Sequence, residues 1–144
     1  FKHTPGYRSA YLAVRRHWTD LMALAAIDRY RRSKRHLFVD IDNVLSLSAA
    51  RVRRAGGQKQ AYDANEVMRD QPVPDAMAAL KELGKLYFVR LLTARGQYED
   101  AFNVTLTWLE MWGFMYDELI VVPRAEDKVA HLSGDSLLVD DFTV

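Results

Sequence analysis

Short apolar runs alternate with longer amphipathic segments along most of this chain. Four runs have the length and composition of buried strands: residues 36–39, 86–92, 119–122 and 136–139. The segments between them predict helices over about 74–83, 98–112 and 125–132, and glycines typical of helix C-termini follow the first two. This alternation predicts an α/β fold, a Rossmann-like parallel sheet with helices on both faces.

A long helix is predicted before the first strand. Thr4 and Pro5 are typical of a helix start, and the helix extends for about 28 residues, or ~42 Å. Apolar residues recur in steps of four and three at Tyr7, Tyr11, Val14, Trp18, Leu21 and Ala25. We expect this stripe to pack against the sheet of the same chain. A dimer formed through the helix is the alternative.

The chain divides at the end of this helix. Residues 1–35 form the basic amphipathic helix, and residues 36–144 form the α/β domain. Residues 43–73 carry weak signals, so we expect a loop with a short helix there, which leaves room for a small cap or none. The sequence does not begin with Met and stops three residues after Asp141, so we expect it to be a piece of a longer protein that lacks a C-terminal tail.

Composition excludes several classes of protein. The 144 residues are 49% hydrophobic and include no cysteine, which rules out thiol catalysis, disulfides and cysteine-based zinc sites. The four histidines show no metal-ligand spacing. No apolar segment approaches the roughly 20 residues that span a bilayer, and no signal-peptide pattern is present. We therefore expect a cytoplasmic protein with no membrane partner.

Charge is divided unevenly between the two halves of the chain. Residues 1–60 contain 13 Lys and Arg against four Asp and Glu, whereas residues 61–144 contain seven against fifteen. The basic half suits a polyanionic partner such as a nucleic acid. Alternatively, the two halves neutralise each other in the folded protein.

Polar residues follow three of the four predicted strands, namely Asp40 and Asp42, then Thr93 and Arg95, then Asp140 and Asp141. Ligands of parallel α/β sheets bind at the carboxyl ends of the strands. Carboxylates gathered there repel one another by about 4 kcal/mol per pair at ~4 Å, and Mg²⁺ is the natural oxygen-ligated counter-ion. Thr93, Arg95 and Lys128 supply the donors of a phosphate cradle.

The same residues, in this order, resemble the four motifs of the haloacid dehalogenase superfamily. Asp40, Asp42 and Val44 match its DxDx(T/V) motif; Thr93 ends an apolar strand, as in the second motif; Lys128 matches the third; and Asp140 and Asp141 match the paired acids of the fourth. Thr93 and Arg95 also resemble the (S/T)-x-R turn of polynucleotide kinase–phosphatase 3′-phosphatase domains and some nucleotidases. The resemblance covers residues 36–141.

This resemblance implies a magnesium-dependent phosphomonoester hydrolase that works through an aspartyl-phosphate. Asp40 would be the nucleophile and Asp42 the general acid and base. The implied Mg²⁺ ligands are the Asp40 carboxylate, the Asp42 backbone carbonyl and Asp141, with Asp140 beside them. Thr93 and Lys128 would stabilise the phosphoryl group, and Thr93, Arg95 and Asn43 would contact the substrate, a nucleotide or a nucleic-acid 3′-phosphate end.

Two other interpretations remain open. The chain could be a catalytically idle module that binds through its basic helix, or the phosphatase domain of a larger enzyme that acts on sugar phosphates. A phospho-acceptor receiver domain uses similar residues, but its acid pair follows the first strand, whereas here the paired acids come last. Arg124 is an alternative to Lys128 as the cation beside the nucleophile.

Overall fold

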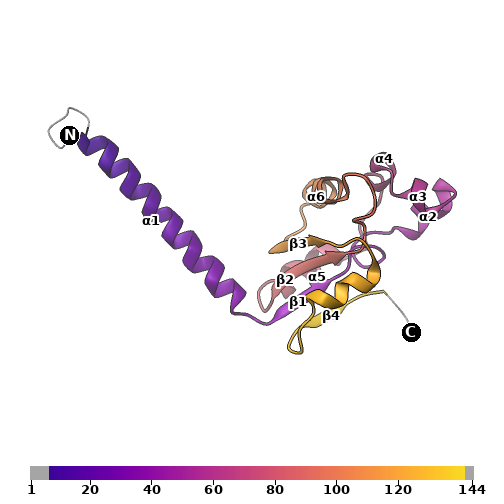
Figure 1. The fold of residues 1–144 in the computed structure, drawn as a ribbon. Coiled ribbons are helices and arrows are strands. Elements are labelled where there is room, and N and C mark those ends of the chain that lie inside the picture. Colours follow the sequence, from indigo (N-terminus) through magenta and orange to yellow (C-terminus); the bar gives the residue numbers. More distant parts are fainter. Residues whose placement is uncertain (1–6, 142–144) are drawn as a thin grey trace. The chain divides into compact units, whose positions relative to one another are not determined.

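The N-terminal part of the chain is a single helix. The computed structural model describes residues 7–141, and the chain divides into two compact units, Phe1–Lys34 and Arg35–Val144. Helix α1 (Tyr7–Arg32) has 26 residues and accounts for the first unit (Figure 1). The predicted start at Thr4 and Pro5 lies outside the described residues. The long N-terminal helix itself is confirmed.

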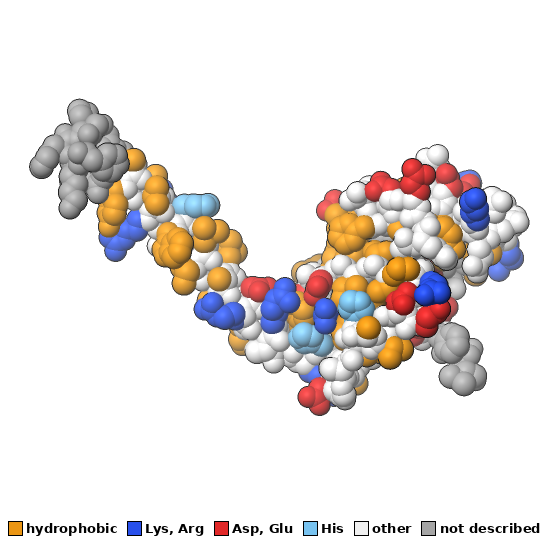
Figure 2. Space-filling view, in the orientation of Figure 1, with side chains coloured by type: hydrophobic (Ala, Val, Ile, Leu, Met, Phe, Trp, Pro, Cys, Tyr) orange, Lys and Arg blue, Asp and Glu red, His pale blue; other side chains and the backbone are white. Residues whose placement is uncertain are grey.

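Apolar side chains on α1 are exposed on the surface of the helix. The stripe residues Tyr11, Val14, Trp18 and Leu21 are between 45% and 70% exposed, and Figure 2 shows apolar side chains spread along the helix among basic ones. The side chain of Tyr7 lies outside the described part. What covers this stripe, the same chain or a second copy, stays a prediction.

Among residues 7–141, no helix combines the length and apolar character needed to cross a membrane.

The second unit is built on four parallel strands. They are β1 (His36–Val39), β2 (Phe88–Thr93), β3 (Glu118–Val121) and β4 (Leu137–Val139), in the spatial order β3-β2-β1-β4 (Figure 1). β1 is therefore central, between β2 and β4. The strands lie within two residues of the predicted runs, and the predicted α/β parallel fold is confirmed.

Alternating side chains of the strands form a core on each face of the sheet. On one face Leu37, Val39 and Leu91 pack with α5 (Ala76–Leu83) and α6 (Ala101–Trp112), which contribute Leu80, Trp108 and Leu109 among others. On the other face a smaller cluster of Phe38, Leu92 and Val122 packs with Leu132, which follows the 3₁₀ helix η1 (Ala125–His131). The α-helix predicted over 125–132 is thus a 3₁₀ helix.

The segment between β1 and α5 contains three short helices rather than a loop with one. They are α2 (Ala49–Ala55), α3 (Gln58–Ala61) and α4 (Ala64–Val67). The two ends of this segment lie side by side, because Leu47 N donates to Gln71 O and Val73 N donates to Leu45 O, both at 2.8 Å. We call residues 43–73 the insert. Helices of four residues leave no periodic signal in the sequence, which explains why they were not predicted.

A close backbone approach fixes the turn that follows β2. Gly96 N donates to Val122 O at 2.9 Å, and a Cβ atom at position 96 would lie 2.9 Å from the carbonyl carbon and oxygen of Val122. Real Cβ atoms do not approach backbone atoms so closely. The neighbouring residue Arg95 is therefore held at the carboxyl edge of the sheet by a contact that only glycine permits.

Gly96→Ala should destabilise the protein by about 1–3 kcal/mol, since the added methyl group forces the turn away from Val122. Gly134→Ala is the control, because a Cβ there meets nothing within 4 Å. The free energy of unfolding, measured in urea, should fall for the first variant and stay within about 0.5 kcal/mol of the parent for the second. Equal effects would contradict the assigned role of Gly96.

Candidate active site

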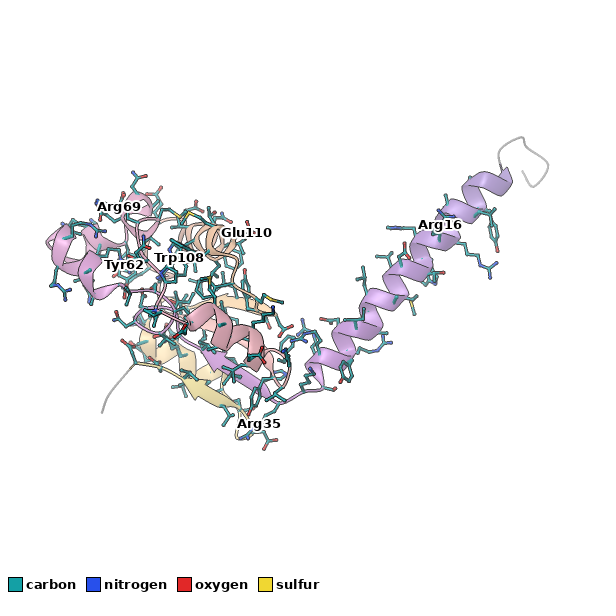
Figure 3. The ribbon with its side chains drawn as sticks, turned by 180° about the vertical axis from the view of Figure 1, so that it is seen from behind. Arg16, Arg35, Tyr62, Arg69, Trp108 and Glu110 are labelled. Carbon is teal, nitrogen blue, oxygen red and sulfur yellow. The ribbon has the colours of Figure 1, made fainter. Side chains whose placement is uncertain are left out.

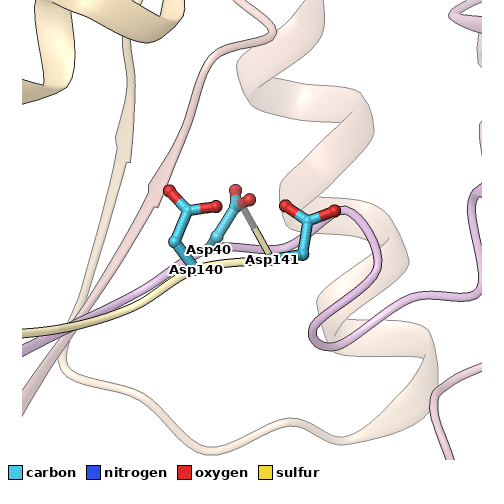
Figure 4. A group of neighbouring side chains, drawn as sticks. All are labelled: Asp40, Asp140 and Asp141. Atoms are coloured by element: carbon cyan, nitrogen blue, oxygen red, sulfur yellow. The ribbon is translucent and has the colours of Figure 1, made fainter. Parts of the chain in front are cut away.

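Three aspartates meet at the carboxyl edge of the sheet. Asp40 follows β1, and Asp140 and Asp141 follow β4, its neighbour (Figure 4). One carboxylate oxygen from each lies within 4.8 Å of the others, so the group could hold a metal ion. Asp40 is buried, Asp140 is half-buried and Asp141 is exposed. The site is thus open on the Asp141 side and enclosed around Asp40.

Little positive charge surrounds the buried carboxyl group of Asp40. Burial raises its pKa to about 7, with Lys128 opposing the rise and Asp140 adding to it. Lys128 Nζ lies 3.2 Å from one oxygen of Asp40 and 3.2 Å from one of Asp140. One ammonium group therefore serves two carboxylates. A divalent cation would complete the neutralisation, and the all-oxygen donor set fits Mg²⁺.

Asp42 lies only two residues further along but in the opposite electrostatic environment. Arg95 donates to both of its oxygens, at 2.7 and 3.1 Å; Arg51 donates at 2.9 Å; and the Tyr62 hydroxyl donates at 3.0 Å. Burial alone would raise the pKa of Asp42, but Arg95 first and then Arg51 lower it to about 2. The carboxylate is therefore ionised and held by four hydrogen bonds.

Arg51 links the insert to this carboxylate, and the sequence analysis missed it. Its side chain is fully buried, and its second ion pair, to Asp70 at 3.0 Å, lies on the insert as well. The indole N–H of Trp108 donates to the backbone carbonyl of Asp70 at 3.1 Å. Burial raises the pKa of Asp70 to about 6, against the effect of Arg51. Three arginines occur on α2, at 51, 53 and 54, and no local pattern distinguishes the buried one.

Tyr62 is the second residue that sequence reasoning missed. Its ring lies under the guanidinium of Arg51, 4.5 Å from the ring centroid to the Arg51 Cζ atom, while its hydroxyl donates to Asp42. Figure 3 shows the labelled Tyr62 on the insert. A lone tyrosine between two four-residue helices gives no signal in the sequence, because its partner Asp42 is 20 residues away.

Thr93 lies at the end of β2 with its hydroxyl unused. The residue is fully buried, and Thr93 Oγ1 has no hydrogen-bond partner among the described residues. Burying a hydroxyl without a partner costs about 1–3 kcal/mol. Such an orphaned donor at the edge of the sheet is what a missing oxygen-bearing ligand would leave.

Arg95 and Asn43, the other predicted substrate contacts, already have partners within the protein. Arg95 uses two nitrogens on Asp42, and its third, Nη1, donates to Thr105 Oγ1 at 3.1 Å. Asn43 Nδ2 donates to Asp141 at 3.2 Å, and Asn43 Oδ1 accepts from Ser48 and from Ala49 N. Their contacts with a substrate stay predictions. What they do here is hold Asp42 and Asp141.

Thr93→Val should leave stability unchanged or raise it, because the substitution removes a buried hydroxyl that has no partner. It should lower the rate of phosphate release from an aryl phosphate at least about ten-fold if the hydroxyl binds the phosphoryl group. Thr105→Val is the matched comparison. It should lower stability, since Arg95 Nη1 loses its acceptor. A large loss of stability in Thr93→Val would contradict the orphaned hydroxyl.

Arg51→Met should destabilise the protein by about 3 kcal/mol or more, because it removes the buried cation between Asp42 and Asp70. Arg53→Met is the control, an exposed arginine on the same short helix. Urea unfolding measures both variants. If both lose the same small amount of stability, the insert is not anchored through Arg51.

The comparisons with known proteins bear on the fold. No family model matches the sequence, and no curated protein matches it. Among solved structures, a chain of the Pnkp1/Rnl/Hen1 RNA repair complex is 21% identical with a TM-score of 0.56, covering 75% of this chain and 36% of that one. A chain in a second structure of the Pnkp1/Rnl/Hen1 complex is 20% identical with a TM-score of 0.53, covering 74% of this chain and 38% of that one.

A haloacid dehalogenase-like family hydrolase from Streptococcus pneumoniae is also similar, with 13% identity and a TM-score of 0.57. The match covers 76% of this chain and 77% of the other. The chain has the haloacid dehalogenase-like fold.

Proposed function

We propose that this protein is a magnesium-dependent phosphomonoester hydrolase that works through an aspartyl-phosphate on Asp40. The observation that carries the proposal is the buried Asp40 carboxyl beside Asp140, Asp141 and Lys128. A nucleophilic carboxylate of this kind needs a nearby cation to hold the negatively charged phosphoryl group. Lys128 supplies one positive charge, and the acid cluster offers a place for a second.

In the first step of the proposed reaction, an oxygen of Asp40 attacks phosphorus and the bond from phosphorus to the leaving oxygen breaks. The leaving oxygen takes a proton from Asp42. In the second step Asp42 removes a proton from water, which attacks the phosphoryl group and releases Asp40. The bonds to Arg51 and Arg95 favour the ionised form of Asp42, which the second step uses. The first step requires those bonds to weaken as the substrate binds.

Mg²⁺ would be held by Asp40 and Asp141, with Asp140 positioned by Lys128 and Asn43 positioning Asp141. When bound, it would neutralise the carboxylates and polarise a phosphoryl oxygen. Thr93 Oγ1, which has no partner among the described residues, would donate to another phosphoryl oxygen. The proposal thus gives Thr93 Oγ1 a hydrogen-bond partner, and it is the one buried side-chain oxygen that has none among the described residues.

The substrate would be a nucleotide or a nucleic-acid 3′-phosphate end. The (S/T)-x-R resemblance at Thr93 and Arg95 and the similarity to a chain of an RNA repair complex both support this class. A phosphatase panel of nucleotides, 3′-phosphorylated oligonucleotides and sugar phosphates, with and without EDTA, tests it. Release from sugar phosphates alone would favour the alternative substrate class, and release from none would favour an idle binding module.

Asp40→Asn should abolish turnover of an aryl phosphate, since a neutral amide replaces the attacking carboxylate while the shape of the side chain is kept. Asp135→Asn is the control, because Asp135 is an exposed acid that precedes β4 and lies outside the cluster. Phosphate release in the presence of Mg²⁺ measures both. Turnover by Asp40→Asn near the parental rate would remove Asp40 as the nucleophile.

The free energy of unfolding of the metal-free protein should depend on pH through the protonation of Asp40. Because the pKa of Asp40 rises from 3.8 to about 7 on folding, the folded state binds the proton more tightly. The stabilising contribution is complete below about pH 4 and is lost as the pH rises through about 7. Asp40→Asn should therefore raise the free energy of unfolding in EDTA by up to about 4 kcal/mol at about pH 8.5, and by much less at about pH 5.

Adding Mg²⁺ at the higher pH should stabilise the parent more than Asp40→Asn, because only the parent has a charged carboxylate at position 40 to bind the ion. Differential scanning calorimetry measures both effects. A difference between parent and variant that does not change with pH would contradict the assigned titration.

A further inference from the structure

A large cavity is linked to the candidate active site through Tyr62, which lines the cavity and donates to Asp42. It has a volume of about 1010 Å³ and lies between the insert, around α3 and α4, and the turn that leads from β2 into α6. On the insert side its wall includes Lys59, Tyr62 and Asp63. On the other side it includes Tyr98 and Glu99. None of these residues belongs to the four motifs.

Tyr62 connects this cavity to Asp42. Its hydroxyl donates to Asp42 Oδ2 at 3.0 Å, and its ring stacks on that of Tyr98, with the centroids 4.2 Å apart and the planes 12° apart. In the proposed reaction Asp42 gives its proton to the leaving oxygen. The leaving group must then lie next to Asp42. Tyr62, which donates to Asp42, also forms part of the cavity wall.

The lining determines which leaving groups are compatible with the cavity. Three of its side chains are acidic, namely Asp63, Glu99 and Asp100, and Lys59 is the single basic one. Carboxylates, together with the amides of Gln60 and Gln97, accept hydrogen bonds from hydroxyl and amino groups. Tyr98 and Arg51 already cover the ring of Tyr62, so the surface that the aromatic pair offers to a planar ring is the side of Tyr98 turned away from Tyr62. A net negative lining repels additional phosphates within a Debye length of about 8–10 Å.

We propose that this cavity binds the leaving group of the substrate, and that this group is an uncharged, ring-bearing alcohol of nucleoside type rather than a polyanionic strand. The inference rests on the proposed phosphatase function and narrows its substrate class. The preferred substrate is then a nucleoside monophosphate. A nucleic-acid 3′ end with the same terminal nucleoside is a poorer one.

Two substrates that differ only in added phosphodiesters test the proposal. We compare kcat/KM for thymidine 3′-monophosphate with that for a single-stranded oligonucleotide ending in the same nucleotide and 3′-phosphate. At low salt and with Mg²⁺ present, the mononucleotide should be preferred about ten-fold or more, and added salt should reduce the preference. An oligonucleotide hydrolysed as well as the mononucleotide, or better, overturns the proposal.

Charge reversals in the cavity extend the test in both directions. Glu99→Lys should reduce the preference for the mononucleotide several-fold, and Lys59→Glu should increase it, because both side chains are exposed and line the cavity. Glu110→Lys is the matched control on α6, an exposed acid that is not part of the lining (Figure 3). It should leave the preference as it is. Identical preferences in all three variants overturn the assignment of the cavity.

Phenyl phosphate separates this inference from the function on which it rests. Its leaving group carries no charge and no ribose, so its hydrolysis depends on the site at the edge of the sheet. No Mg²⁺-dependent phosphate release from any of the three substrates overturns the phosphatase function, and the inference fails with it. Release from phenyl phosphate with no preference between the two nucleotide substrates overturns the inference alone.

Discussion

The carboxylate of Asp42 is the point at which three separate segments of the chain are joined. It follows β1, Arg51 reaches it from the insert, and Arg95 reaches it from the turn after β2. Each of these charges is largely removed from water, so losing any one leaves a buried charge without its partner, at a cost of several kcal/mol. Gly96 fixes the turn that carries Arg95, and Asp70 fixes Arg51. This one anion therefore joins the insert to β1 and to the turn after β2.

Asp40 and Asp42 show how a fold can give two like residues different chemistry. Both follow the central strand, yet burial raises the pKa of Asp40 to about 7, whereas Arg95 and Arg51 lower that of Asp42 to about 2. Asp42 pairs with Arg95 and with Arg51, which it shares with Asp70, whereas Asp40 shares one lysine with Asp140. A divalent cation beside Lys128 would provide the positive charge that the surroundings of Asp40 lack. Without a cation these shifts run opposite to the proposed roles, so a bound cation must lower the pKa of Asp40 and substrate binding must raise that of Asp42.

The fold and part of the site were predictable because they depend on local pattern and one topological rule. Apolar runs located the four strands, and the carboxyl ends of parallel strands meet, which brings Asp40 together with Asp140 and Asp141. Arg51 and Tyr62 were not predictable, since their roles come from contacts with Asp42 at separations of 9 and 20 residues in a segment of short helices. The same reason explains why the bonds from Arg95 to Asp42 were not predicted; its contact with a substrate stays a prediction. Local pattern does not tell which partner a buried guanidinium takes.

The measurement that tests the account most directly is chemical capture of the phosphoryl group on the protein. The parent and Asp42→Asn are mixed with an aryl phosphate and Mg²⁺, quenched in acid during turnover, and digested for mass spectrometry. The account predicts one phosphoryl group on the peptide that contains Asp40. With an aryl phosphate whose leaving group departs without a proton from Asp42, the amount should be greater in Asp42→Asn, because only the second step is then slowed. Phosphate release without any phosphorylated peptide, or with the group on another residue, would contradict it.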